Sequence, residues 1–256
     1  MDLRGKVAIV TGSSSPTGVG GAIAKTFAGR GCHVVVNYVH NRDGAEEVVT
    51  SCVAAGGEAH AVQANVATDL DCRRLVGEAI QRWGRLDVLV NNAAITRPVP
   101  LGEFELIQDD EFHKLYAVNV VGSFQMARAA APHLKSTGDA AIVNISSAAA
   151  FLGNGSSIAY AASKGALNTL TLSLARALAP EVRVNAICPG GLLGNWTQKL
   201  MSKDAYEART LEAETRFPLR RGVWPADVAN QVLFLVEGAT TLTGEFLRSD
   251  SGGHLL

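Results

Sequence analysis

The sequence predicts an α/β protein with a doubly wound parallel sheet of about seven strands and helices on both faces. Short, continuous apolar runs such as Val7–Val10 are typical of strands that are buried on both faces of a sheet. These runs alternate with helical segments along the chain, which is typical of parallel strands joined by crossover helices. A glycine-rich turn follows the first run and leads into a helix. Together these observations favour a fold that binds its ligand beyond the carboxyl ends of the strands.

Length and composition predict one globular domain. The chain has 256 residues, of which 47% are hydrophobic and 18% are charged, an ordinary balance for a protein with a substantial core. It contains no linker, sequence repeat or low-complexity tract, so residues 1–256 are predicted to form a single domain. The net charge of −1 offers no basic field for nucleic acid or an anionic membrane.

The first residues of the chain and its cysteines predict a cytoplasmic protein. Residues 1–6 are charged, and the apolar run after them is too short for a secretory signal or a membrane span. The four cysteines are scattered and form no C-x-x-C motif, so reduced thiols are expected rather than disulfides. The six histidines form no ligand-spaced pair, and no metal site is predicted.

The first unit of the chain predicts a phosphate-binding turn. Residues 11–21 are rich in glycine and serine and lie between the strand Val7–Val10 and a helix predicted over residues 22–30. Glycines let the backbone turn tightly and approach a ligand, and the helix N-terminus offers free N–H groups to a pyrophosphate. The alternative is a glycine-rich turn that only connects the strand to the helix.

The remaining elements continue the alternation. Further strands are predicted at residues 33–38, 59–64, 86–90, 141–145, 182–187 and 245–248. Helices are predicted at residues 44–55, 70–83, 109–134, 156–179 and 226–236. Residues 192–224 break the rhythm and are predicted to form a substrate-side insertion that includes a polar helix over residues 203–216.

Tyr160 and Lys164 are four residues apart in the predicted helix 156–179, so their side chains lie on one face. A tyrosine hydroxyl has an ordinary pKa of about 10, and a neighbouring cation favours the phenolate. The pair therefore suits a general acid and base. The alternative is two surface residues that share this spacing by chance.

Several motifs occur together in one order along the chain. They are Thr11-Gly12, Gly18-Val19-Gly20, Asn91-Asn92-Ala93-Ala94, Asn119, Ser147, Tyr160 with Lys164, and Pro189-Gly190. In this order the chain resembles the short-chain dehydrogenase/reductase family along essentially its whole length. Residues 34–38 and 144–147 are most similar to the 3-oxoacyl-acyl-carrier-protein reductase group. The resemblance implies a Rossmann fold and an NAD(P)-dependent oxidoreductase that acts on a small-molecule carbonyl or secondary alcohol.

The resemblance implies four catalytic residues. Tyr160 would exchange the proton with the substrate oxygen, and Ser147, thirteen residues earlier (160 − 147 = 13), would hydrogen-bond that oxygen. Ser146 is the second candidate for this serine. Lys164 would lower the pKa of the tyrosine and hold the nicotinamide ribose. Asn119 would keep a water in a proton relay, or would be a buried amide that bonds the neighbouring backbone.

The resemblance also implies a set of cofactor-binding residues at the carboxyl ends of the strands. The phosphates would be held by Gly12, Ser14, Gly18, Val19 and Gly20, and the adenosine ribose by Tyr38 and Arg42. The adenine would lie against Asn65 and Val66, and the middle of the cofactor against Asn92 and Ala93. The nicotinamide end would lie against Pro189, Gly190 and Leu192, together with Tyr160 and Lys164.

The chain departs from the family pattern mainly in its first loop. Five residues, 13–17, separate Gly12 from Gly18 where three are usual, so this loop is longer. The other departures are Asn65 in place of Asp, Ala94 in place of Gly, Gly194 where Thr is common, and one extra residue in 250–253. Whether Thr197 replaces the missing threonine stays open. None of these changes removes a catalytic group.

The end of the second predicted strand favours NADP(H) over NAD(H). An NAD-specific site places Asp or Glu there, and that carboxylate repels a 2′-phosphate. Here the position is Tyr38, and Arg42 follows with a guanidinium fork that matches phosphate oxygens. Against this, Thr17 stands where a basic residue is common, and Asp43 is close enough in sequence to pair with Arg42.

The residues argue against other functions and favour a homo-oligomer. A protein that only senses NAD(P) has no need of the complete catalytic set. The fold of a methyltransferase gives no reason for the presence of Tyr160 and Lys164. Family members that reduce enoyl groups space these two residues more widely. Small residues on the predicted helix 156–179 permit close helix packing, so a homo-oligomer, tetramer or dimer, is expected. The substrate would be chosen by loops 95–107 and 192–224. The aromatic residues Trp196, Phe217 and Trp224 there either line a pocket or pack the lid on the domain.

Overall fold

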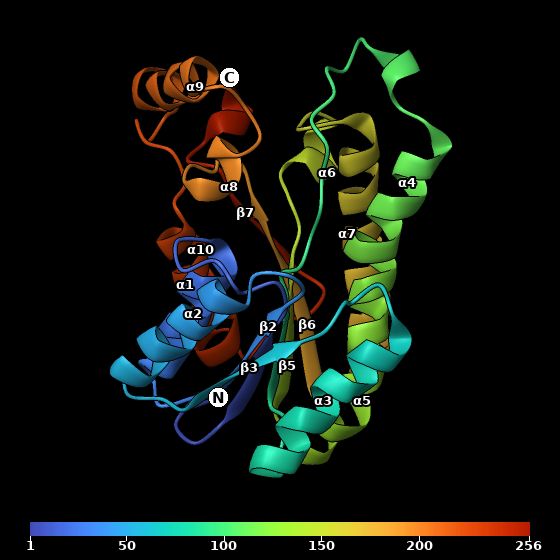
Figure 1. Cartoon of the computed structure of the whole chain (residues 1–256), viewed down its shortest axis with the longest axis vertical. Helices are drawn as coiled ribbons and strands as arrows, with labels where there is room; N and C mark the ends of the chain where they lie inside the picture. Colours follow the sequence, from blue (N-terminus) through green and yellow to red (C-terminus); the bar gives the residue numbers. More distant parts are fainter.

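The computed structural model describes residues 1–256 apart from the side chain of Phe104. Its centre is one sheet of seven parallel strands in the order β3-β2-β1-β4-β5-β6-β7 (Figure 1). The strands are β1 Val7–Val10, β2 His33–Tyr38, β3 Ala59–Gln63, β4 Val88–Asn91, β5 Ala140–Ile145, β6 Val182–Pro189 and β7 Phe246–Ser249. The predicted doubly wound parallel fold is confirmed.

Helices cover both faces of this sheet (Figure 1). The helices on one face are α1 Val19–Ala28, α2 Arg42–Ala54 and α10 Pro225–Leu233, and those on the other are α3 Asp69–Trp83, α5 Ser123–Thr137 and α7 Ile158–Leu178. Alternate strand residues face opposite layers, as the pleat requires. Ala8 and Val10 of β1 belong to the apolar cluster under α1, whereas Val7 and Ile9 belong to the cluster under α5.

The strand order places a ligand crevice at β1 and β4. The chain proceeds from β1 to β2 and β3 on one side and from β4 to β7 on the other, so the connections diverge between β1 and β4. In open α/β sheets such a divergence leaves a crevice beyond the carboxyl ends of the strands. The turns after Val10 and Asn91 therefore open into one place.

Two predicted helices contain a π-helical turn. The segment predicted as one helix over residues 109–134 is α4 Asp109–Tyr116, a π-helical turn Ala117–Gly122, and α5. A second π-helical turn, Phe234–Gly238, continues α10. Hydrophobic periodicity does not report one extra residue in a turn, and such turns are frequent at functional sites. The first of them carries Asn119.

The segment predicted as an insertion, residues 192–224, contains two helices above the carboxyl end of the sheet (Figure 1). They are α8 Asn195–Gln198 and α9 Lys203–Thr215. Both ends of the segment are tied together, because Leu193 donates a backbone hydrogen bond to Val223 and Val223 donates one to Gly191. Within the described residues, no helix is both long and apolar enough to cross a membrane.

Candidate active site

A buried lysine fixes the position of α7 against the sheet. Lys164 is 2% exposed, and its Nζ donates a 2.8 Å hydrogen bond to the backbone oxygen of Ile145, the last residue of β5. Ser157 begins the helix, and its Oγ accepts a hydrogen bond from the backbone N–H of Tyr160. Tyr160, one turn before Lys164, is thereby held beside the residues that follow β5.

The two serines after β5 have different surroundings. Ser146 is 3% exposed, and its Oγ donates to Asn168 Oδ1 at 2.6 Å, so its hydroxyl is already bound in the core. Ser147 is half-buried, with its Oγ 3.5 Å from the Pro189 backbone oxygen and close enough to Tyr160 to affect its pKa. Ser147, and not Ser146, faces the tyrosine hydroxyl.

Burial dominates the protonation of the pair. It raises the pKa of Tyr160 to about 12, a rise that the Ser147 hydroxyl partly opposes. Burial also lowers the pKa of Lys164 to about 8. The expectation that Lys164 lowers the pKa of the tyrosine stays a prediction. The ammonium donates its hydrogen bond to Ile145, and its Nζ lies 5.6 Å from the centre of the Tyr160 ring.

Asn119 joins three elements of the site from its π-helical turn. Its Oδ1 accepts from the Ile95 backbone N–H at 2.9 Å, and its Nδ2 donates to the Ile95 oxygen and to Ser163 Oγ. Ser163 in turn donates to the Tyr160 backbone oxygen at 2.7 Å. The amide thus bonds the Ile95 backbone and supports the helix turn that carries Tyr160.

Glycines make the turn after β1 a cradle. Gly12 has φ +59°, and a Cβ there would lie 2.8 Å from the Ala93 Cα. A Cβ on Gly20 would lie 2.6 Å from Asn92 Nδ2 and 2.7 Å from the Ser13 Cα. Asn92 also donates through Nδ2 to the Gly12 backbone oxygen at 2.9 Å. The turns after β1 and β4 are therefore in direct contact, and side chains at Gly12 and Gly20 would separate them.

The longer glycine loop folds back over the start of α1. Gly18 donates a backbone hydrogen bond to Ser15, and a Cβ on Gly21 would lie only 2.2 Å from the Ser15 oxygen. The additional residues thus occupy space that glycine leaves open on the first helical turn. They also bring Thr17 to α8, where Asn195 Nδ2 lies 3.3 Å from Thr17 Oγ1. The loop contacts the segment 192–224 directly.

The residues predicted for the adenosine end lie around the beginning of α2. Asn41 caps α2 and donates through Nδ2 to the Ser14 backbone oxygen at 3.0 Å, which brings the glycine loop beside Arg42. Arg42 is exposed and pairs at 3.9 Å with Glu46, not with Asp43. Tyr38 is half-buried at the end of β2.

The other predicted positions lie where adjacent strands end. Asn65 follows β3, and its Oδ1 accepts from the Ala67 backbone N–H, while Val66 is buried against Gly122. Gly190 follows β6, and a Cβ there would lie 2.8 Å from the Cβ atoms of Ala148 and Asp250. Leu192 is bridged to Val223. Thr197 is buried and donates to the Leu192 backbone oxygen, so its hydroxyl is bound within the segment.

Two polar residues of the site carry roles that sequence reasoning did not assign. Thr11 Oγ1 accepts from the backbone N–H groups of Asn92 and Ala93, both at 3.0 Å. Asn37 Oδ1 accepts from the Gly12 N–H, and its Nδ2 donates to the Ala64 oxygen. A buried asparagine inside an apolar strand was the available signal for the second role.

Comparison with known proteins agrees with this geometry. A family model described as enoyl-(acyl carrier protein) reductase matches residues 12–254. A protein named as a ketoacyl reductase of the granaticin polyketide synthase, from Streptomyces violaceoruber, is 41% identical over 98% of this chain and 96% of its own. The 3-oxoacyl-acyl-carrier-protein reductase FabG of Staphylococcus aureus is 35% identical over 98% of both chains.

A solved structure extends the match to the whole fold. The crystal structure of a protein named as a short-chain dehydrogenase/reductase, from Burkholderia xenovorans, superposes with a TM-score of 0.89 at 40% identity and covers 98% of each chain. The chain belongs to the short-chain dehydrogenase/reductase family. It is an enzyme of this family, whose members use a nicotinamide cofactor.

The residues present in this dehydrogenase/reductase fit such a cofactor. The first turn of α1 contains no acidic side chain and no side-chain cap, so its N–H groups are free for a pyrophosphate. The absence of Cβ atoms at Gly12 and Gly20 lets the backbone approach the ligand closely. Among the described residues, no cluster of three His, Cys, Asp or Glu side chains could hold a metal.

The Gly20→Ala variant should bind NAD(P)H at least about tenfold more weakly, because its Cβ pushes the glycine loop away from Asn92. Fluorescence titration of the reduced cofactor measures this. Gly77→Ala is the matched control, since nothing lies within 4 Å of the added Cβ in α3. The control should bind normally and gain about 0.4–1 kcal/mol in the free energy of unfolding. If Gly20→Ala bound NAD(P)H with wild-type affinity, the claim that a side chain at Gly20 disturbs the cofactor site would be wrong.

Proposed function

We propose that this enzyme is an NAD(P)H-dependent carbonyl reductase that converts the keto group of a small molecule to a secondary alcohol. The observation that carries the proposal is the pairing of Tyr160 with Ser147. A tyrosine hydroxyl has an ordinary pKa of about 10, and burial raises the pKa of Tyr160 further, so the hydroxyl carries its proton at neutral pH. It therefore fits a proton donor to a developing alkoxide, with Ser147 as the second hydrogen-bond donor.

The relatives support a keto substrate over an enoyl substrate. Two of the similar proteins are named as ketoacyl or 3-oxoacyl reductases, which makes a 3-oxoacyl thioester a reasonable substrate class. The matching family model carries an enoyl reductase description. The Tyr160–Lys164 spacing of four residues is that of the keto-reducing relatives, whereas enoyl-reducing relatives space these two residues more widely.

The mechanism divides the work between the cofactor and the chain. When bound, the nicotinamide supplies the hydride. Ser147 donates a hydrogen bond to the substrate oxygen, and Tyr160 donates the proton as charge develops there. Lys164 holds the helix in register and places a positive charge beside the tyrosine as its proton leaves. Asn119 holds Ser163 and the Ile95 backbone, which keeps the tyrosine turn in place.

The same residues argue against a protein that only senses the cofactor. A sensor needs the glycines of the turn after β1 to bind the cofactor. It has no need of a protonated Tyr160 beside the half-buried Ser147. We also propose a single domain over residues 1–256, with residues 192–224 as the substrate-side segment. All four cysteines are free and buried, which supports a reducing, cytoplasmic location.

Replacing Tyr160 with Phe should lower kcat by roughly 10²–10⁴-fold, because the ring stays and the proton donor is lost. Cofactor binding, measured by fluorescence, should persist. Ser147→Ala should lower kcat more than Ser146→Ala, since the Ser146 hydroxyl is bound to Asn168. Near-normal turnover of the Tyr160→Phe variant, or the opposite order of the serine variants, would contradict these roles.

We propose NADP(H) as the preferred cofactor. No carboxylate ends β2, and Arg42 begins α2 beside the glycine loop. Its ion pair with Glu46 is long, at 3.9 Å, and both side chains are more than half exposed. Exposed pairs of this kind contribute little, so a 2′-phosphate can take the place of Glu46.

The wild-type enzyme should show a higher kcat/KM with NADPH than with NADH. In Arg42→Ala, kcat/KM for NADPH should fall about tenfold because a charge-assisted contact is lost, with little change for NADH. Glu46→Gln is the control, since it frees Arg42 and should preserve the use of NADPH. Equal losses for both cofactors in Arg42→Ala, or a wild-type preference for NADH, would exclude this assignment.

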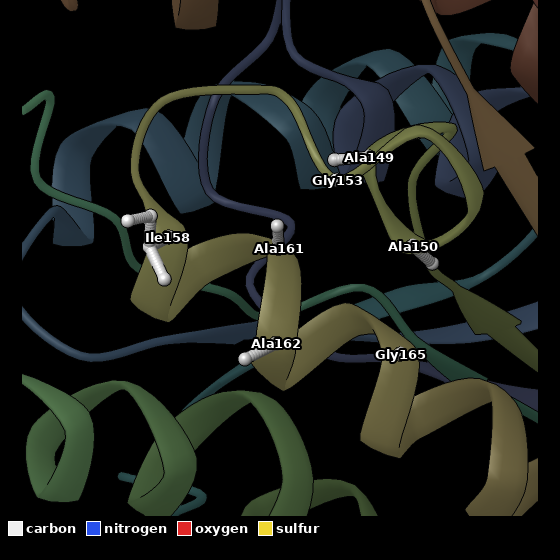
Figure 2. Close-up of a pocket in the computed structure, with 7 residues that line it drawn as sticks. All are labelled: Ala149, Ala150, Gly153, Ile158, Ala161, Ala162 and Gly165. Atoms are coloured by element: carbon white, nitrogen blue, oxygen red, sulfur yellow. The ribbon is translucent and has the colours of Figure 1, made fainter. Parts of the chain in front are cut away.

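We propose a homodimer through α5 and α7, and a tetramer through a second contact. A shallow depression of about 320 Å³ lies between α7 and the short helix α6 Ala149–Leu152. Figure 2 shows the residues around it. It is lined by Ala149, Ala150, Gly153, Ile158, Ala161, Ala162 and Gly165. None of these is a predicted site residue. Phe124 of α5 is 41% exposed beside a second apolar hollow between α5 and α7. A second copy would cover both hollows.

Light scattering at micromolar concentration should give the mass of a dimer or tetramer. Ala162→Arg places a long, charged side chain on the exposed face of α7 and should reduce the mass. Ala208→Arg is the control, because Ala208 lies on the exposed side of α9. A monomeric wild-type mass would refute the assembly, and an unchanged mass for Ala162→Arg would place it on another face.

A further inference from the structure

Three arginines of the described chain are half-buried, and two of them have complete partners. Arg85 forms a two-pronged contact with the buried Asp87, at 2.8 and 2.7 Å. Arg183 donates to three backbone oxygens at the end of the last helical segment, at 2.7–2.9 Å. The third, Arg209 of α9, differs from both.

Arg209 has no partner among the described residues. Its Nε is buried without a hydrogen bond, no carboxylate lies within 4 Å of it, and it does not stack on an aromatic ring. Its neighbour Glu212 pairs instead with Arg216, at 3.1 Å. Burial lowers the pKa of Arg209 while Glu212 and Tyr206 oppose this at a distance. A guanidinium that is half withdrawn from water and unpaired is unfavourable, so a bound anion would stabilise it.

Arg209 lies on the inward face of the substrate-side segment. On α9 the less exposed positions are Tyr206, Arg209, Thr210 and Ala213, which recur at helical spacing. Tyr206 accepts through its hydroxyl oxygen from the Gly194 backbone N–H at 3.0 Å. This face of α9 is therefore directed at the chain that leaves β6.

That chain leads directly from the catalytic residues. Phe217, two residues after α9, packs so closely that a Cβ on Gly191 would lie 2.5 Å from its ring. Gly191 is two residues from Pro189, whose backbone oxygen is 3.5 Å from Ser147 Oγ. Arg209 lies between Tyr206 and Phe217 in the sequence, and its helix α9 is at the end of the sheet that also carries α6 and α8 (Figure 1).

We propose that Arg209 binds an oxyanion of the substrate, a carboxylate or a phosphate at a distance from the reacting carbonyl. This proposal rests on the proposed carbonyl reductase function and names the class of its substrate. The guanidinium offers several donors in a planar fork that matches both groups. The 192–224 segment would then select anionic ketones and hold them over Ser147 and Tyr160.

The first test is kinetic. Wild-type enzyme should favour a keto acid over its methyl ester by roughly 10–100-fold in kcat/KM, and a keto phosphate should show whether phosphate is accepted as well. In Arg209→Gln the ratio of kcat/KM for the acid to kcat/KM for the ester should fall to near one, because KM for the acid rises. The KM for the cofactor should stay unchanged. Arg216→Gln, an exposed arginine of the same region, is the control and should retain the ratio.

The outcomes separate the two proposals. Reduction of the ester with no preference for either anion in the wild type would overturn the role of Arg209 and leave the carbonyl reductase function intact. Failure of the wild-type enzyme to reduce any ketone would contradict the carbonyl reductase function instead. A rise in the cofactor KM of Arg209→Gln would assign the arginine to the cofactor and overturn the proposal.

The second test does not depend on turnover. Butyrate or butyl phosphate should raise the Tm of the wild-type enzyme, and the increase should be lost in Arg209→Gln. Without ligand, Arg209→Gln should unfold at the wild-type temperature or higher, because it removes an unpaired buried cation. A clearly lower Tm without ligand, together with an unchanged response to both anions, would show a structural role and contradict the proposal.

Discussion

The hydrogen bond from Lys164 to the last carbonyl of β5 is the constraint on which the active site depends. A buried ammonium is unfavourable unless it is bound, so α7 cannot slide or rotate without losing this contact. The serines follow directly after Ile145 and Tyr160 lies one turn before Lys164, so one contact sets the distance between Ser147 and Tyr160. Desolvation in the same place raises the pKa of the tyrosine.

The fold and the main site positions could be predicted because they depend on local patterns. Apolar runs and their alternation with helices identify parallel strands, and in such sheets the loops after the carboxyl ends meet. Gly12 and Gly20 are needed because backbone from two loops lies where a Cβ would be. Ser147, Tyr160 and Lys164 are brought to one place by β5 and α7, as their order in the chain indicated.

Other features depend on contacts between distant segments and have no local signal. The π-helical turn at Asn119 adds a residue to a helix whose hydrophobic pattern continues through it. The pKa of Tyr160 depends on its burial by several elements, which a local spacing of four residues does not report. The contact of Thr17 with Asn195 joins residues 178 apart, and the missing partner of Arg209 is visible only once its surroundings are known.

The central claim is that hydride is transferred to a carbonyl carbon while Tyr160 supplies the proton. The most direct measurement uses NADPH deuterated at the transferred position, with a 3-oxoacyl and an enoyl thioester as substrates, and locates the label in the product by mass spectrometry and NMR. The account predicts one deuterium on the new carbinol carbon of the 3-oxoacyl product and none in the enoyl substrate. Deuterium on the former double bond, without label at a carbinol carbon, would contradict it.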